Sequence, residues 1–251
     1  MNITCLSYWY PIIQQIKEIK TPQTLIVLTD LHLWELLDGN MPEGYGEFVG
    51  EIVKCADSIG YPCFLRTGLF SSKHRWRKTC YIEKREDIPH HVYSIIEDSN
   101  MVDLLGLDTN VWAIRKFLPT KPIFFAFGGM PVTEEYRFFV REGKVEHFQP
   151  YWPPVSLEDA RHIDPLPHNW RSELKKISLI EPLDLAYLSS LTELVGERLG
   201  GYWSVDWLKT ENGWYLTDMA EGDKSYKWEP LKHPKFIKRE NNEIIDDKRT
   251  D

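Results

Sequence analysis

The sequence lacks the patterns that mark several common classes of protein. Its four cysteines, Cys5, Cys55, Cys63 and Cys80, form no C-x-x-C pair and have no histidine cluster beside them. This argues against a zinc site and favours reduced thiols in the cytosol. No run approaches the roughly 18 apolar residues of a membrane-spanning helix, and no basic stretch followed by an apolar run opens the chain. We therefore expect a cytoplasmic protein with no membrane partner.

The chain also lacks an excess of positive charge. Among 251 residues, 30 are Lys or Arg and 38 are Asp or Glu, which gives a formal net charge of −8. This balance argues against bulk nucleic acid as a partner, but it leaves room for a local basic pocket that binds a small anion. An apolar fraction of 42% and an aromatic fraction of 13% predict a well-filled core in one large or two small domains.

Hydrophobic patterns predict a mixture of strands and helices. We expect strands at 25–29, 62–66, 111–117, 136–140, 145–148, 202–209 and 214–218, and helices at 47–59, 89–105 and 183–199. A stripe on the last helix is expected to face the core; it comprises Leu183, Tyr187, Leu191, Leu194 and Val195. We expect an irregular segment at 150–182 and a frayed, charged tail at 238–251. Because hairpins join the later strands, these elements indicate an α+β protein with antiparallel sheet.

Two acids lie on strands that are expected to pair. Asp206 lies inside an apolar strand and Asp218 ends its partner, where a carboxylate is costly unless something binds it. Oxygen ligands from adjacent strands suit a divalent cation, whereas exposed strand positions or pairing with arginines are the alternatives. A plain two-residue turn at Asn212–Gly213 would set Asp206 opposite Met219. A shared cation therefore requires a loop of three or five residues, or a bulge such as one at Gly213.

Cations and an apolar linker could surround a small polyanion. Arg66 ends a strand, and Lys73 ends the Gly- and Ser-containing loop that follows, which could fold over phosphates or be a solvated basic turn. Residues 115–118 run from a basic strand end into an apolar linker that could flank adenine, and an acid at 134–135 could hold ribose hydroxyls. The alternative is a surface salt bridge, for example between residues 115 and 135.

In their order along the chain, these pieces resemble the ATP-grasp proteins and, within that superfamily, the cell-division-cycle D-one-two-three family, which includes a chaperone that assembles a translation initiation factor. The resemblance covers about Cys63 to Trp228. Its blocks are Phe64–Thr67 with Ser71–Lys73, Ile114–Phe117, Glu135–Val140, and Val205–Asp206 with Thr217–Asp218. Arg66 stands where the family usually has Lys. Ala220 stands where it usually has a metal-contacting Asn, which Glu221 or Asp223 could replace.

The resemblance implies an ATP-grasp fold in which two antiparallel-sheet-containing subdomains sandwich the nucleotide. It implies an N-terminal α/β region at 1–60, an ATP-grasp domain at 61–235 and a charged tail at 236–251. Asp206 and Asp218 would hold Mg, and Arg137 would be the catalytic cation near an acylphosphate. The implied ATP contacts comprise phosphate-binding cations, hinge residues and ribose-binding acids: Arg66, Lys73, Lys116, Phe117, Leu118, Glu134 and Glu135.

The implied activity is that of an ADP-forming carboxylate–amine or carboxylate–thiol ligase, with ATP and Mg as cofactors and a small molecule or a protein as acceptor. One alternative is an assembly factor that uses ATP without ligating anything. The other is a scaffold that no longer turns over ATP. A nucleotide site without a basic acceptor pocket would favour the assembly factor, and absence of ATP binding would favour the scaffold. The segments 1–60 and 150–182 could carry specificity, but they show no motif.

Overall fold

A computed structural model describes residues 2–102, 106–160, 165–228, 237–238 and 243–244. The chain divides into two compact units. Unit 1 comprises Met1–Tyr8, Pro22–Leu118 and Phe127–Met130; unit 2 comprises Trp9–Thr21, Pro119–Ala126 and Pro131–Asp251. Most of the charged tail that was expected at 238–251 lies outside the described residues. Each unit contains its own antiparallel sheet, so each is described by itself below.

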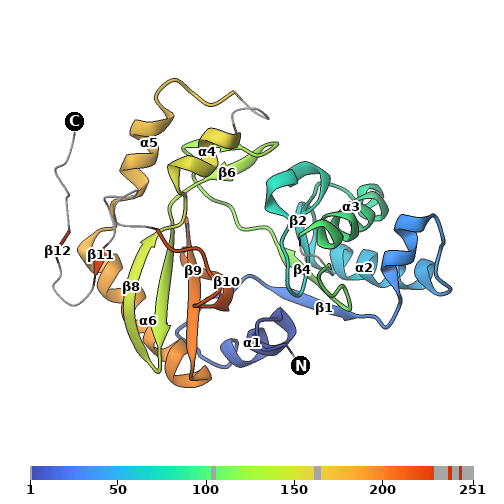
Figure 1. The fold of residues 1–251 in the computed structure, drawn as a ribbon, viewed down its shortest axis with the longest axis horizontal. Helices are drawn as coiled ribbons and strands as arrows, with labels where there is room; N and C mark the ends of the chain where they lie inside the picture. The colour runs from blue at the N-terminus through green and yellow to red at the C-terminus, as the bar shows by residue number, and fades with distance from the viewer. Residues whose placement is uncertain (1, 103–105, 161–164, 229–236, 239–242, 245–251) are drawn as a thin grey trace. The chain divides into compact units, whose positions relative to one another are not determined.

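Unit 1 is built on a four-stranded antiparallel sheet in the order β1–β4–β2–β3 (Figure 1). The strands are β1 (Thr24–Leu28), β2 (Cys63–Thr67), β3 (Tyr81–Ile82) and β4 (Val111–Lys116). The helices are α2 (Tyr45–Ile59), α3 (Ile88–Met101) and the short 3-10 helices η1 (Leu33–Asp38), η2 (Lys73–Lys78) and η3 (Arg85–Asp87). Most of these elements lie close to their predicted ranges, but the 3-10 helices were not predicted.

Alternation along β2 and β4 decides which side chains of unit 1 meet α2 and α3. Cys63 and Leu65 on β2 join Trp112 and Ile114 on β4 in a buried apolar cluster with residues of both helices. The side chains between them point to the other face of the sheet, because successive residues of a strand alternate. That face includes two buried arginines, which are described with the candidate site below.

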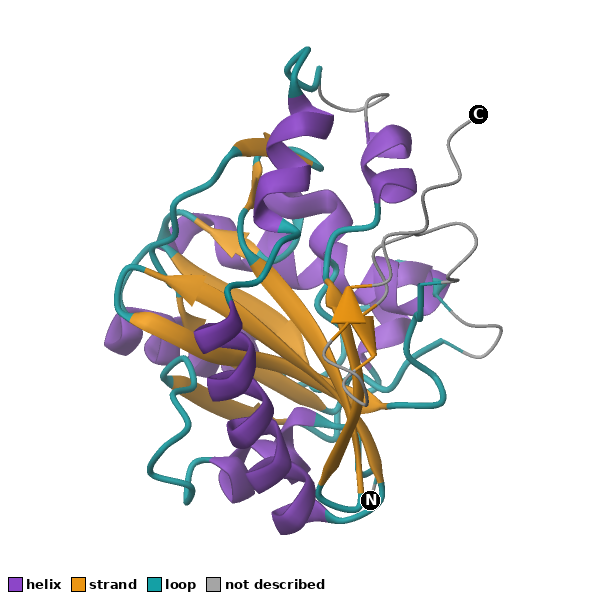
Figure 2. Ribbon diagram, turned by 90° about the vertical axis from the view of Figure 1, so that its left-hand side faces the viewer, coloured by secondary structure: helices purple, strands orange, loops and turns teal. Residues whose placement is uncertain are grey.

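Unit 2 contains a six-stranded antiparallel sheet in the order β10–β9–β7–β8–β11–β12 (Figures 1 and 2). Its strands are β7 (Glu135–Arg141), β8 (Lys144–Pro150), β9 (Tyr202–Thr210), β10 (Gly213–Glu221), β11 (Ile237–Lys238) and β12 (Glu243–Ile244). The helices that follow β8 are α4 (Pro154–Ala160), α5 (Trp170–Ile177) and α6 (Pro182–Leu199). A separate two-stranded sheet consists of β5 (Phe124–Ala126) and β6 (Met130–Val132), which were not predicted.

Aromatic side chains fill the layer between this sheet and α6. Phe138 stacks on Phe148 of the neighbouring strand at 5.1 Å between ring centroids. Trp207 is fully buried, and its Nε1 donates a hydrogen bond of 2.9 Å to the hydroxyl of Thr192 on α6. The high aromatic content therefore fills a core, as the composition predicted.

The N-terminal segment Trp9–Thr21 belongs to unit 2. It includes the second half of α1 (Leu6–Ile13), a helix that was not predicted from the sequence. Ile13, Ile16 and Ile19 are buried, and the Leu216 N–H on β10 donates to the Lys20 carbonyl at 2.9 Å. The segment thus lies along the outer edge of β10.

Two predictions about the region around α6 were wrong in part, although Leu191 and Val195 of the expected stripe are buried. The segment 150–182 is not irregular throughout, since it forms α4 and α5. On α6, Leu183 is 86% exposed and Tyr187 is 49% exposed, whereas the buried stripe runs through Leu188, Leu191 and Val195. One turn before Leu188, this stripe continues with Asp184, which a lysine of β9 binds. Because Asp184 is polar and faces inward, the hydrophobic pattern did not show which face of α6 packs on the sheet.

None of the described helices is long and apolar enough to cross a membrane. All four cysteines are free thiols.

Candidate functional site

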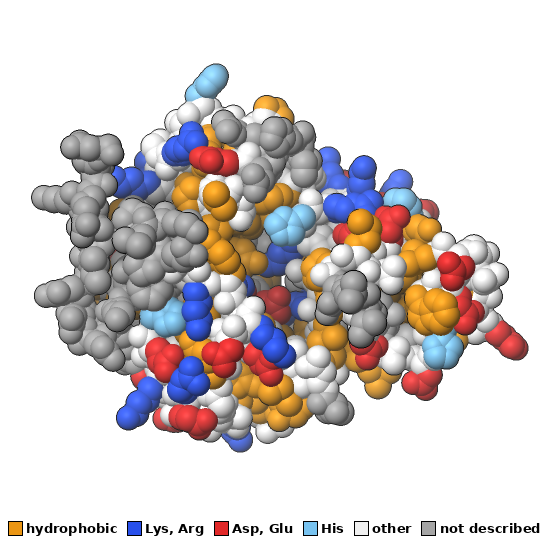
Figure 3. Space-filling view, in the orientation of Figure 1, with side chains coloured by type: hydrophobic (Ala, Val, Ile, Leu, Met, Phe, Trp, Pro, Cys, Tyr) orange, Lys and Arg blue, Asp and Glu red, His pale blue; other side chains and the backbone are white. Residues whose placement is uncertain are grey.

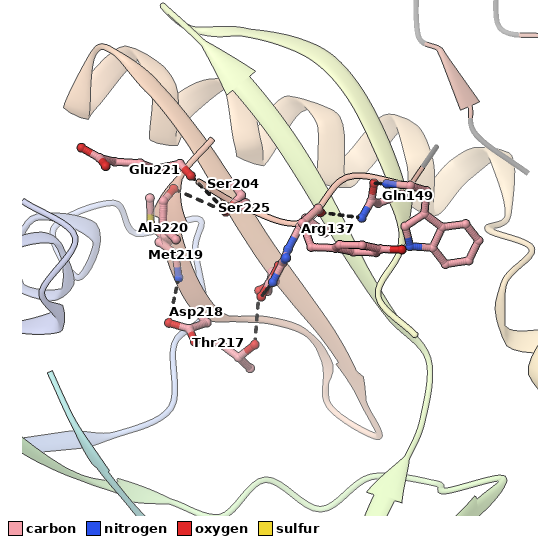
Figure 4. Close-up of polar contacts among 12 residues, drawn as sticks. Arg137, Gln149, Ser204, Thr217, Asp218, Met219, Ala220, Glu221 and Ser225 are labelled. Carbon is pink, nitrogen blue, oxygen red and sulfur yellow. Dashed lines mark hydrogen bonds and ion pairs between the residues drawn. The ribbon is translucent and has the colours of Figure 1, made fainter. Parts of the chain in front are cut away.

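One face of the unit 2 sheet carries a row of polar side chains across four adjacent strands (Figure 4). Gln149 on β8 lies opposite Arg137 on β7, and Arg137 lies opposite Asp206 on β9. Asp206 in turn lies opposite Asp218 on β10. Residues opposite one another on antiparallel strands are close enough for their side chains to interact. These four residues are called the polar row below.

A β-bulge brings Asp218 into the polar row. The pairing of β10 with β9 shifts between Leu216 and Asp218, which leaves Thr217 as the extra residue. Without this shift, alternation would put Asp218 on the same face as Leu216, in the core against α6. The bulge that a shared cation requires is therefore present, although it lies at Thr217 and not at Gly213. The turn is a plain two-residue one, but it lies at Glu211–Asn212 and not at Asn212–Gly213 as expected, because Thr210 pairs directly with Gly213.

A second bulge brings Gln149 into the row. The pairing of β7 with β8 shifts between Phe139 and Val140. A regular hairpin counted from the turn, where Arg141 pairs with Lys144, would set Phe148 opposite Arg137. The shift sets Gln149 there instead. The sequence analysis missed Gln149 because no glycine or proline lies at Val145–His147, where the register shifts.

The centre of the polar row is an ion pair between neighbouring strands. Arg137 donates from Nε to Asp206 Oδ1 at 2.7 Å and from Nη2 to Oδ2 at 2.8 Å. Its guanidinium lies 5.1 Å from the centre of the Tyr151 ring. Asp206 is only 3% exposed. Burial by itself lowers the pKa of Arg137, but the charge of Asp206 and the hydrogen bonds to it outweigh burial and raise that pKa. Arg137 therefore stays charged and compensates the buried carboxylate.

The donor set of the polar row suits Mg bound together with phosphate groups. Among the described residues, no group of three or more His, Cys, Asp or Glu side chains is arranged to hold a metal ion. Mg, however, is commonly bound by one or two carboxylates together with substrate phosphates and waters. Asp206 and Asp218 are two such carboxylates on adjacent strands. A carboxylate offers about four acceptor positions, so the two bonds from Arg137 leave Asp206 able to accept more.

Of the two carboxylates expected to replace the side-chain oxygen that Ala220 lacks, neither is directed toward Asp218. Glu221 lies opposite Trp203 in the register, and it forms an ion pair with Lys224. Figure 4 shows its carboxylate reaching away from Asp218. Asp223 is exposed. Nearer to Asp206, the Thr217 hydroxyl donates to the Asp206 carbonyl oxygen at 3.3 Å.

The chain that follows β10 is fixed to the face of the sheet that carries the polar row. We call residues 222–228 the strap. The Ser225 and Ser204 hydroxyls are hydrogen-bonded at 2.5 Å, which ties the strap to β9. Gln149 donates from Nε2 to the Tyr226 carbonyl at 3.1 Å and accepts from the Trp228 N–H at 2.9 Å. Gln149 is therefore a residue that positions the strap.

The two acids expected to bind ribose take different positions. Glu135 lies on β7 two residues from Arg137, so by alternation it shares the face of the polar row. Glu134 forms an ion pair of 3.1 Å with Lys209, which also binds Asp184 of α6 at 2.9 Å. Burial raises the pKa of Glu134, and the bond to Lys209 opposes this. Glu134 thus belongs to the α6 side of the sheet.

The expected phosphate-binding cations lie in unit 1. Arg66 and Arg115 project from β2 and β4 on the face opposite α2 and α3, and each is 4% exposed. Arg66 donates from Nε to the Thr67 carbonyl at 3.0 Å, and Arg115 donates from Nε to the Thr24 hydroxyl at 3.2 Å. Lys73 begins η2, so the loop expected after Arg66 is partly helical.

The expected hinge follows β4 and adjoins an aromatic cluster. Phe117 makes edge contacts with Trp76 at 6.2 Å and Tyr81 at 5.3 Å between ring centroids. Trp76 in turn stacks on Tyr81 at 5.5 Å. Lys116 ends β4 and is exposed, and Leu118 is half-buried. The hinge residues therefore lie beside a flat, apolar surface formed by rings.

Solved structures share this fold. The chain matches C-terminally truncated Cdc123 from Schizosaccharomyces pombe at a TM-score of 0.53 and 14% identity, covering 92% of this chain and 90% of that one. It matches the biotin carboxylase domain of 2-oxoglutarate carboxylase from Hydrogenobacter thermophilus, solved with MgADP, ADP and bicarbonate, at a TM-score of 0.55 and 13% identity. That match covers 91% of this chain and 41% of the other.

The chain is shorter than several of the structures that it matches. It spans 60% of a RimK-domain ATP-grasp protein from Sphaerobacter thermophilus, with 89% of this chain covered, 11% identity and a TM-score of 0.46. The sequence matches no protein-family model and no curated protein. The matches to solved structures confirm an α+β, ATP-grasp fold and the resemblance of that fold to Cdc123.

Proposed function

We propose that this protein binds ATP and Mg, and that Asp206 and Asp218 hold the metal on the polar face of the unit 2 sheet. One observation carries the proposal: a bulge at Thr217 sets these carboxylates opposite each other on neighbouring strands. A bulge disrupts the ladder locally and is kept where a side chain must be re-aimed. Bound Mg would neutralise charge on the β- and γ-phosphates.

The proposal assigns the remaining contacts by position within each unit. In unit 1, Arg66 and Lys73 would bind phosphates, and the hinge Lys116–Leu118 would flank adenine beside the ring cluster of Trp76 and Tyr81. In unit 2, Glu135 is the better candidate for ribose hydroxyls, because the companion acid at 134 is held on the α6 side by Lys209. The ion pair with Lys209 thus excludes Glu134 and leaves Glu135 as the candidate for binding ribose.

We assign the proposed ATP site to an ADP-forming ligase reaction. The γ-phosphoryl group of ATP would pass to a carboxylate, giving ADP and an acylphosphate, from which an amine or thiol would then displace inorganic phosphate. The Arg137 guanidinium is committed to Asp206 at 2.7 and 2.8 Å. Arg137 would therefore position Asp206 as a metal ligand, and this role fits its bonds better than direct contact with an acylphosphate does. The match that covers 90% of truncated Cdc123 supports a second candidate, an ATP-dependent assembly factor that ligates nothing.

Calorimetric titration with ATP and Mg tests the metal site. Asp218→Asn keeps an oxygen that can accept the Met219 N–H, now bonded to Asp218 Oδ1 at 3.0 Å, so the fold should survive. The variant should lose measurable Mg–ATP binding because a neutral amide is a poor Mg ligand. Asp223→Asn, which changes an exposed acid of the strap, is the matched control. Unchanged ATP affinity in Asp218→Asn would exclude the proposed metal site.

Product analysis then separates the candidate activities. The wild-type protein is incubated with Mg–ATP and single amino acids or thiols, and ADP, AMP, phosphate and pyrophosphate are measured. ADP and phosphate that appear only with an acceptor support the ligase. Binding without acceptor-dependent turnover supports the assembly factor. A wild-type protein that binds no ATP would leave only the scaffold that has lost nucleotide binding.

A further inference from the structure

Both hydrogen bonds described above for the Arg137 guanidinium go to Asp206. Another cation on the polar face of the unit 2 sheet would therefore have to bind a second ligand. Several basic residues of unit 2 are engaged by acids. Lys209 is bound by Glu134 and Asp184, and Lys224 is bound by Glu221. In contrast, Lys227 makes no ion pair with any described residue. It lies in the strap, one residue from the Trp228 N–H that Gln149 holds.

Two rings hold the ammonium group of Lys227 over the sheet. Lys227 Nζ lies 5.2 Å from the ring centre of Phe139 and 4.7 Å from that of Tyr202. Phe139 lies two residues from Arg137, so its ring shares the face of the polar row. Tyr202 lies four residues from Asp206 on β9 and, by the same alternation, on the same face. These contacts direct the Lys227 side chain onto the face that carries Asp206.

A second cation lies near the same ring. The Arg141 guanidinium lies 3.7 Å from the centre of the Tyr202 ring. Arg141 is exposed and bonds Glu146 at 2.8 Å, and the charge of Asp223 contributes to raising its pKa. Glu146 and Asp223 therefore compensate the charge of Arg141, whereas Lys227 forms no ion pair with a described residue. Two cations that share one ring repel each other, and an anion placed beside Lys227 would relieve this repulsion.

The strap also gives Lys227 a fixed backbone. It is tied on one side by Ser204–Ser225 and on the other by both polar groups of the Gln149 amide. A binding residue on a fixed segment loses less conformational entropy when a ligand arrives. Basic and acidic side chains intermix on the face that Figure 3 shows.

We propose that Lys227 binds the carboxylate group of a second ligand on the face of the unit 2 sheet that also carries Asp206 and Asp218. The identification of this ligand as the acceptor rests on the proposed function, but the binding of a carboxylate by Lys227 does not. The carboxylate could belong to a small acid or to an acidic side chain of a protein. The two sources share one recognition chemistry, a charge-assisted hydrogen bond from the ammonium group.

Direct binding of carboxylate probes tests the proposal. Succinate, L-glutamate and a tetraglutamate peptide are titrated into the full chain by calorimetry, with and without Mg and a non-hydrolysable ATP analogue. Lys227→Met keeps the apolar stem over the rings but removes the charge, and should weaken probe binding about 10- to 100-fold. Lys227→Arg keeps the charge and should retain most of the affinity. Lys224→Met, a neighbouring strap lysine that pairs with Glu221, should bind the probes as the wild type does.

The outcomes distinguish the sources and the two proposals. Preference for succinate or glutamate identifies a small acid, and preference for tetraglutamate identifies an acidic protein segment. The carboxylate proposal is overturned if no probe binds the wild type, or if Lys227→Met binds the probes as tightly as the wild type does. If the wild type binds the carboxylate probes but does not bind the ATP analogue, the proposed nucleotide function is contradicted and the carboxylate proposal stands. Urea unfolding of each variant shows whether a loss of binding is a loss of fold.

Discussion

The sheets of the two units differ in the regularity of their strand pairing. In unit 1, β4 pairs with both β1 and β2 without a register shift, and plain alternation sets Arg66 and Arg115 on the face opposite the helices. In unit 2, register shifts at Phe139/Val140 and Leu216/Asp218 interrupt the pairing. Each shift moves one polar side chain into the polar row. The irregular sheet is therefore the one whose side chains have been re-aimed.

The Nε bonds of the buried arginines also differ between the units. In unit 1, Arg66 and Arg115 donate to a carbonyl and a hydroxyl, which are neutral acceptors. In unit 2, Arg137 donates to the carboxylate of Asp206, which is itself buried. Removing the unit 2 cation would leave a buried negative charge uncompensated, whereas removing the Thr24 hydroxyl in unit 1 would remove one neutral acceptor.

The largest expected effect comes from breaking the unit 2 ion pair. Arg137→Met should lower the free energy of unfolding by about 3–5 kcal/mol, because it leaves Asp206 buried and uncompensated. Thr24→Val in unit 1 should cost less, about 1 kcal/mol, because it removes only a neutral hydroxyl that accepts a hydrogen bond from Arg115. Urea unfolding of both variants measures the difference. The double variant Arg137→Met/Asp206→Leu should recover much of the loss, and equal losses in the two single variants would contradict the comparison.

The next effect concerns nucleotide affinity in unit 1. Arg66→Ala should weaken ATP binding about 10- to 100-fold through loss of one charge-assisted contact to phosphate. Arg66→Lys, which introduces the residue usual in the resembling family, should retain most of the affinity. Calorimetry measures both, with Arg77→Ala, a change at an exposed arginine of η2, as the control. An Arg66→Ala variant with wild-type affinity would remove Arg66 from the phosphate site.

A smaller effect is a pH dependence of opposite sign in the two units. In unit 1, burial lowers the pKa of His91, which is buried and lies 2.6 Å from the Thr79 carbonyl. Its contribution to stability is present above its ordinary pKa of 6.5 and is lost as pH falls through the lower folded value. In unit 2, burial raises the pKa of Glu134 from 4.5, so its contribution is lost as pH rises through the higher folded value.

Substituting either residue should remove its own part of the pH dependence of the free energy of unfolding. His91→Gln should remove stability loss that begins below about pH 6.5, and Glu134→Gln should remove loss that begins above about pH 4.5. Thermal or urea unfolding between these limits and beyond them measures the slopes. A wild-type slope that persists in both variants would show that other groups set the pH dependence.

The smallest effect should come from deleting Thr217. Without the extra residue, Leu216 and Asp218 become neighbours in a regular strand, and alternation alone then puts Leu216 in the core and Asp218 opposite Asp206. The deletion removes the Thr217 hydroxyl bond to the Asp206 carbonyl, worth about 1 kcal/mol. Mg–ATP affinity should therefore stay within a few-fold of wild type. A large loss would show that Thr217 or the bulge's twist contributes directly to the site.

The sequence predicted the regular parts of the molecule best. Residues 63–67 and 111–116 form strands because each short apolar run ends at a turn or a polar residue, and α2 ends at Gly60, where φ is 87°. Asp206 and Asp218 could be singled out because a carboxylate in an apolar strand is costly. Their positions opposite each other could not be derived, because the register depends on a bulge that no local residue signals.

Other features escaped prediction because they arise from tertiary contacts. Leu183 and Tyr187 fit the period of α6, but the packed stripe is the one that continues to Asp184, whose charge a distant lysine on β9 binds. Gln149 lies next to a proline in a strand and acquires its role only when the strap crosses nearby. Pairings between residues far apart in sequence therefore set the parts of the candidate site that the sequence left open.

The bond between Leu216 and Lys20 has a consequence for how the chain can be divided. The stretch Trp9–Thr21 is synthesised before nearly all of unit 1, yet it lies along the edge of β10, which is made last among the long strands. A fragment that begins at 119 would therefore carry a bare strand edge, and such edges invite pairing between molecules. Adding residues 9–21 as a separate peptide should suppress that aggregation, so unit 2 is a two-piece structure that closes only after β10 has been synthesised.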